Sequence, residues 1–168
     1  MSSFEFKFRN ITVLLFSVVL CFWTASAAAR CWTSDLSEDE QLAVARETFE
    51  TELFAESIEA SKCYLDEFPV GNSREEILYL KSESFRKSGK LNDAVRGYDE
   101  LMISYPASNE YLEKVMFHKG LLQARIKKYP DSMNSLKIFL LKFPNSSFSD
   151  EAYYWLGMLL PIMLSCCV

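Results

Sequence analysis

The sequence has little of what most catalytic and nucleic-acid-binding proteins need. Its 168 residues include one histidine, His118, and five glycines that stand singly along the chain. Neither a histidine-based triad, nor a multi-histidine metal site, nor a glycine-rich phosphate loop can be built within one such chain. Acidic residues outnumber basic ones by 23 to 18, a net charge of −5, so no positive surplus is available for phosphates. We therefore expect no catalytic residues, no metal, no cofactor and no nucleic-acid partner.

The N-terminal segment has the pattern of a secretory signal peptide over residues 1–29. Two basic residues precede an uncharged apolar run, Ile11 to Trp23, and Ala25-Ser26-Ala27 matches the small-residue cleavage pattern. The run is shorter than the roughly 20 residues that span a bilayer, which favours cleavage over an uncleaved membrane anchor. We expect an exported chain that begins between Ala28 and Arg30.

Four cysteines remain after such a cleavage, an even number that suits an oxidising compartment, although their spacing matches no zinc or redox motif. They are Cys31, Cys63, Cys166 and Cys167. Cys31 directly follows the leader, as a lipid-attachment cysteine does, but Arg30 replaces the small residue that normally precedes one. We expect Cys31 to be an ordinary cysteine of a short linker, residues 30–37, and Cys63 to be a small buried apolar residue.

An internal repeat organises the rest of the chain. Three of the prolines that follow an aromatic residue lie 37 and 38 residues apart, at Pro69, Pro106 and Pro144. Small residues stand 24 and 12 positions before each proline: Ala45 and Ser57, Ser82 and Ala94, and Gly120 and Ser132. A fourth set begins at Gly157. Small side chains let two antiparallel helices approach closely, and proline ends the second helix. The register therefore predicts three and a half helical hairpins.

Local signals agree with this register. The predicted helices cover residues 38–53, 55–67, 74–88, 91–104, 109–127, 131–142 and 149–160. Gly89-Lys90 predicts the turn inside the second hairpin. Serine followed by an acidic residue three positions later predicts three capping boxes: Ser37 with Glu40, Ser73 with Glu76, and Ser147 with Asp150. The repeat domain is expected over residues 38–160, with an apolar tail at 161–168.

Two motifs resemble the tetratricopeptide repeat. The segment from Tyr153 to Gly157 is similar to its W-x-x-L-G opening, and Ala94 with Tyr98 and Pro106 is similar to its closing A-x-x-x-F and P. The period exceeds the usual length of about 34 residues because a longer loop follows each proline. This feature resembles the bacterial envelope subgroup that contains BamD and YbgF, also called CpoB.

The resemblance implies an all-α, right-handed helical-hairpin solenoid behind the signal peptide, and a non-catalytic scaffold in the periplasm or at the periplasmic face of the outer membrane. Its partners would be other envelope proteins or peptide segments, as for the outer-membrane assembly factor BamD. Two alternatives are a Tol-Pal-associated coordinator of the YbgF type and an inert truncated fragment of a longer repeat protein. Membrane contact would be peripheral or through an uncleaved leader.

A candidate partner-binding groove follows from the register. The residue three positions before each unit's first small residue should project toward the concave face of the solenoid. These residues are Leu42, Tyr79, Phe117 and Tyr154, and they are flanked by Arg46, Glu83, Arg86, Leu121 and Arg125. Such a stripe can bind an extended or helical segment, whereas the alternative is that its aromatic residues complete the packing between hairpins.

The C-terminal segment carries no charged side chain after Glu151, and Pro161 stands where the fourth hairpin should turn. Repeat arrays normally end in a polar capping helix, so one apolar flank is expected to stay uncovered. Truncation is the interpretation we favour. A docking or self-association surface and a short tail that touches a membrane are the alternatives.

Overall fold

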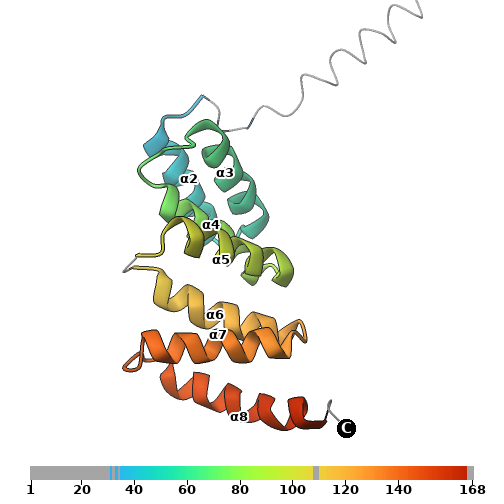
Figure 1. Cartoon of the computed structure of the whole chain (residues 1–168). Helices are drawn as coiled ribbons and strands as arrows, with labels where there is room; N and C mark the ends of the chain where they lie inside the picture. The colour runs from blue at the N-terminus through green and yellow to red at the C-terminus, as the bar shows by residue number, and fades with distance from the viewer. Residues whose placement is uncertain (1–30, 32, 34, 108–109, 166–168) are drawn as a thin grey trace, which may run out of the picture.

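The computed structural model describes residues 31, 33, 35–107 and 110–165, and every regular element among them is an α-helix. Three hairpins, α2/α3, α4/α5 and α6/α7, are followed by α8, and Figure 1 shows them stacked in chain order. The predicted all-α repeat fold is confirmed, while the predicted signal peptide lies outside the described residues. The helices are α2 (Glu38–Glu50), α3 (Phe54–Glu67), α4 (Arg74–Lys87), α5 (Leu91–Ser104), α6 (Leu112–Arg125), α7 (Tyr129–Lys142) and α8 (Ser149–Ser165).

The small residues of the register lie where the two helices of a hairpin approach each other. In the first hairpin the Ser57 hydroxyl donates to the Ala45 carbonyl at 3.2 Å, and both residues are fully buried. In the third hairpin the Ser132 hydroxyl donates to the Gly120 carbonyl at 2.7 Å. A serine hydroxyl on the second helix thus reaches the backbone of the first, which only a close approach of the two helices permits.

The three turns inside the hairpins share one backbone geometry. The second residue after each first helix has a positive φ: Glu52 at 61°, Gly89 at 78° and Lys127 at 63°. In each turn the following N–H donates to a carbonyl five residues earlier, as from Lys90 to Phe85 at 2.9 Å, which is the pattern of a Schellman motif. Only the second turn has glycine, so only that turn was predicted. The register alone places the other two, 37 and 38 residues away.

The apolar core continues through all the hairpins. One cluster joins α2, α3 and α4, a second joins α4, α5 and α6, and a third joins α6, α7 and α8. Leu65 packs against the first and second clusters, and Met102 packs against the second and third. Each hairpin is therefore stabilised by its neighbours, as expected for a stacked repeat.

The predicted capping boxes are only partly correct. Ser37 and Glu40 form one at the start of α2, because the serine side chain accepts from the Glu40 N–H and the Glu40 carboxylate accepts from the Ser37 N–H. Ser73 precedes α4 but makes no side-chain capping bond. Helix α8 begins at Ser149, so its N-cap position is Phe148 and Ser147 lies one residue too early to cap it.

Helix α8 is longer than predicted. It runs through Pro161 to Ser165, so this proline does not end the helix at residue 160. Proline removes one backbone donor and crowds the preceding turn, but leucine and methionine on both sides have high helix propensity. The apolar tail expected at residues 161–168 is therefore helical as far as the structure describes it.

A disulfide bond corrects the expectation for two cysteines. Cys31 and Cys63 are joined with their Cα atoms 5.3 Å apart, so neither is a free thiol. Beside this bond the Gln41 side chain donates to the Thr33 carbonyl at 2.9 Å, and Thr33 is fully buried. The segment expected as a linker therefore packs on the first hairpin. Spacing alone did not reveal this pairing, because the two cysteines are 32 residues apart.

Replacing both bonded cysteines by serine should destabilise the chain. The crosslink closes a loop of 32 residues, and the loss of chain entropy in the unfolded state corresponds to about 3–4 kcal/mol for a loop of that length. Urea unfolding of the Cys31→Ser/Cys63→Ser variant against the oxidised parent measures the difference. The reduced parent is the control and should unfold like the variant. Equal stability of all three proteins would contradict the described bond.

The two glycines of the register should respond oppositely to alanine. A Cβ at Gly120 would lie 2.6 Å from Leu136 Cδ2, whereas a Cβ at Gly157 would meet nothing within 4 Å. Gly120→Ala should therefore cost about 1–3 kcal/mol through overpacking. Gly157→Ala, its matched control, should gain up to about 1 kcal/mol from helix propensity. Thermal unfolding of dilute protein measures both, and similar shifts in the two variants would show that the register is wrong.

Candidate partner-binding groove

A buried carboxylate lies between the second and third hairpins. Glu83 of α4 is 3% exposed and accepts hydrogen bonds from three side chains on three helices. Arg86, one turn along α4, donates at 2.5 and 3.0 Å, and the Tyr98 hydroxyl of α5 donates from the paired helix. His118 Nδ1 of α6 lies 3.2 Å away. A single carboxylate therefore ties α4 to its own hairpin and to the next one.

The hydrogen bonds of this polar cluster decide the charge of Glu83. Burial raises the pKa of the Glu83 carboxyl, but hydrogen bonds from His118, Arg86 and Tyr98 and the positive charge of Arg86 together outweigh burial. The pKa falls to about 2, so Glu83 is ionised at neutral pH. Burial and the adjacent Glu83 raise the pKa of the Tyr98 hydroxyl, which stays protonated and donates.

Two further contacts each join the first helix of one hairpin to the next hairpin along the chain. The Arg46 guanidinium of α2 donates to the Glu76 carboxylate of α4, with 2.6 Å between Nη2 and Oε2. The Tyr79 ring of α4 stacks on the Tyr111 ring with centroids 4.4 Å apart. Burial and the charge of Glu83 raise the pKa of Tyr79 to about 12. These side chains lie along the predicted groove and remain partly accessible.

Two predicted groove residues are buried in the core. Leu42 is 6% exposed and packs in the first cluster. Phe117 is 2% exposed, stacks on Phe148 at 4.7 Å between centroids and packs against Phe139 at 5.5 Å. Neither side chain is presented to a partner in this conformation. At these two positions the structure supports the alternative of packing between hairpins.

The remaining predicted residues lie toward the C-terminal half. Arg125, in the last turn of α6, is exposed, and Leu121 is half-buried against the third cluster. Tyr154 of α8 is 64% exposed, with its ring edge-on to Trp155. The nine residues are therefore not one continuous surface. Their accessible members are Arg46, Tyr79, Arg86, Leu121, Arg125 and Tyr154.

Sequence reasoning missed three members of the site. His118 is the one histidine of the sequence, and its contact with Glu83 was not predicted. Tyr98 was assigned only to the closing motif, and Glu76 only to a capping box. The signal lay in the charge pattern, because Arg46 and Glu83 stand at the same position of successive first helices. Their partners could not be located without the packing of the hairpins.

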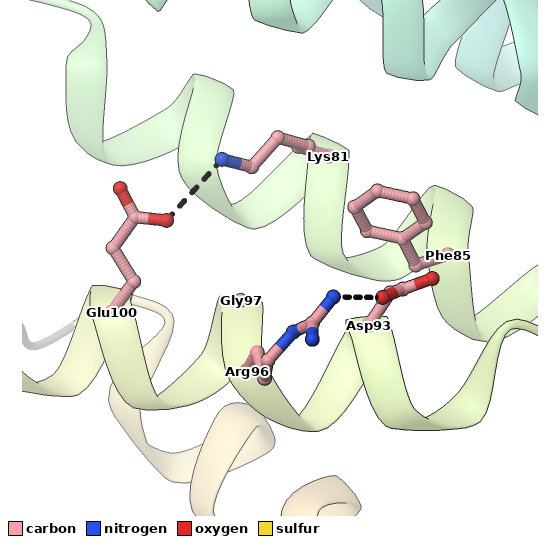
Figure 2. Close-up of a pocket in the computed structure, with 6 residues that line it drawn as sticks. All are labelled: Lys81, Phe85, Asp93, Arg96, Gly97 and Glu100. Carbon is pink, nitrogen blue, oxygen red and sulfur yellow. Dashed lines mark hydrogen bonds and ion pairs between the residues drawn. The ribbon is translucent and has the colours of Figure 1, made fainter.

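A separate small pocket lies between α4 and α5. Figure 2 shows Lys81 reaching Glu100 across it, at 3.2 Å, and Arg96 paired with Asp93. The pocket measures about 160 Å³, and its charged groups are already paired. Lys81 and Lys119 stand where the W-x-x-L-G motif has leucine. Each lysine is paired with a carboxylate, Lys81 with Glu100 and Lys119 with Asp99.

No group of three or more potential metal-binding side chains comes together among the described residues. Over those residues, no helix has the length and apolar character needed to cross a membrane.

Comparisons with known proteins support the fold. No protein-family model matches the sequence, and no curated protein matches it either. A solved tetratricopeptide repeat protein from Parabacteroides merdae is similar to this structure, with a TM-score of 0.62 and 16% sequence identity. The match covers 73% of this chain and 45% of that protein, so the chain spans less than half of its length. The likeness shows that the hairpins stack as tetratricopeptide repeats do.

Glu83→Gln should destabilise the chain at neutral pH by about 2–3 kcal/mol, because charged hydrogen bonds are lost. The folded pKa of about 2 lies below the ordinary value of 4.5, so ionised Glu83 stabilises the fold fully above pH 4.5. That contribution is lost as pH falls from about 4.5 toward 2, and the two proteins should converge. Urea unfolding at pH 7, 5 and 3.5 measures this.

The matched control for this prediction is Glu47→Gln, on the exposed face of α2, which should change stability by less than about 0.5 kcal/mol throughout. A Glu83→Gln deficit that does not change with pH would contradict the role assigned to the carboxylate.

Proposed function

We propose that the protein is a non-catalytic scaffold that binds a segment of another protein along its first helices. The observation that carries this proposal is that α4 and α8 present accessible aromatic residues, Tyr79 and Tyr154, at equivalent positions of the repeat. Arg86 and Arg125 lie beside this row, and at the same position of α6 Phe117 is buried. Stacked repeats use such extended surfaces to bind partners. The described residues offer no comparable site for chemistry on a small molecule.

We further propose that the scaffold is exported and works in the bacterial envelope. The leader has the features of a secretory signal, and the Cys31–Cys63 disulfide suits an oxidising compartment such as the periplasm. The disulfide also uses the sulfur that lipid attachment at Cys31 would require. A cleaved, soluble form at the periplasmic face is therefore preferred over a lipid-anchored form.

The partner we propose is an envelope protein of the outer-membrane assembly machinery, as for BamD. This choice rests on the lengthened loops after the prolines, which resemble that subgroup. A Tol-Pal-associated role of the YbgF type is the second candidate and rests on the same loops. The identity of the protein that the groove captures distinguishes them.

Tyr79→Ala and Arg125→Ala should each weaken capture of this partner by more than about 1 kcal/mol, as truncations at binding hot spots do. Arg125 is exposed, so Arg125→Ala should change stability little, whereas Tyr79→Ala also removes the ring that stacks on Tyr111 and should lower stability. Phe117→Ala should instead cost about 3–5 kcal/mol of folding free energy, because its ring is packed between two others. Crosslinking in envelope extract followed by mass spectrometry measures capture, and urea unfolding measures stability.

The control for capture is Leu141→Ala, an exposed residue of α7 outside the groove. Capture that is lost equally in this control would show a surface elsewhere. No specific capture by the parent protein would favour the inert-fragment interpretation over a scaffold.

A further inference from the structure

Helix α8 presents an apolar face that nothing in the described structure covers. No charged side chain follows Glu151. Five large apolar side chains along the helix are between 50% and 70% exposed: Tyr153, Tyr154, Met158, Leu160 and Leu164. Monomeric proteins rarely expose an apolar patch of this extent. The face therefore belongs to an interface.

The repeat register identifies the kind of interface. Tyr153 is 62% exposed, but the residues at the same position of α2, α4 and α6 are covered by the second helix of their hairpin. Those residues are Gln41, Leu78 and Met116, which are 0%, 0% and 5% exposed. Gly157 shows the same contrast, since its Cβ position is open while that of Gly120 contacts Leu136. The exposed face is therefore the face that receives an antiparallel helix in every complete hairpin.

The covering helix must carry a small residue at the closest approach. Each complete hairpin has one on both helices, as in Ala45 with Ser57 and Gly120 with Ser132. Helix α8 meets this requirement itself, because Tyr153, Gly157, Leu160 and Leu164 lie on one stripe at spacings of four, three and four. Two copies of α8 can therefore pack against each other with glycine opposite glycine.

We propose that α8 pairs with α8 of a second copy, antiparallel about a two-fold axis at Gly157. An antiparallel arrangement keeps Asp150 and Glu151 of the two copies at opposite ends and sets each pair near the apolar C-terminal half of the partner helix, whereas a parallel one would bring four carboxylates together. The pairing uses the stripe of Tyr153, Gly157, Leu160 and Leu164 and does not require Tyr154, the groove residue of α8.

The mass of the mature chain in solution, measured by sedimentation equilibrium over a range of concentrations, tests this proposal. The parent should form a concentration-dependent dimer. Leu160→Glu places a charge in the stripe, and Gly157→Leu blocks the close approach, so each should weaken dimerisation at least tenfold. Both positions are exposed in the single chain, and circular dichroism should show an unchanged helix content.

The matched control is Ile103→Glu, which charges an 81% exposed apolar residue of α5 and should leave the dimer intact. A monomeric parent at every concentration, or a dimer insensitive to both α8 variants, would overturn the proposal. A synthetic peptide of residues 129–145, the helix that covers α6, provides a further arm. Tight binding of this peptide to a chain that never dimerises would show that a different helix covers α8.

Discussion

The close approach of two helices at small residues is the constraint on which the rest of the structure depends. Even an alanine Cβ at Gly120 would overlap Leu136, and the serine hydroxyls at 57 and 132 reach carbonyls of the facing helix only because those helices are close. The distance between the helices fixes the shape of each hairpin. The left-handed residues at 52, 89 and 127 then fix its turn.

The hairpins share one backbone arrangement and stack in order, so equivalent positions on the first helices carry different side chains. At the position three residues before the first small residue of each unit, the Phe117 side chain is buried in the core. The Tyr79 and Tyr154 side chains at the same position remain accessible. The buried Glu83 carboxylate lies beside this row and links three helices through hydrogen bonds to its negative charge. The proposed binding surface therefore lies next to a buried, hydrogen-bonded polar cluster that connects the second and third hairpins.

Sequence reasoning predicted the helices and their register because proline and small residues recur at intervals that packing imposes. It failed where a structural role is not tied to one residue type. Glu52 and Lys127 adopt a backbone usually given to glycine, and Ser73 lacks the capping bond that its spacing suggested. The Cys31–Cys63 bond and the Glu83–His118 contact join residues more than 30 positions apart, which only the folded chain brings together.

A double-mutant cycle at Gly120 and Leu136 tests the central claim most directly. If the distance between α6 and α7 is set by contact at this point, Gly120→Ala should destabilise the parent but have little effect in a Leu136→Ala background, where the clashing atoms are absent. The account predicts a coupling energy of about 1–2 kcal/mol from urea unfolding of the four proteins. Additive effects of the two substitutions would contradict it, because the helices would then not be limited by these side chains.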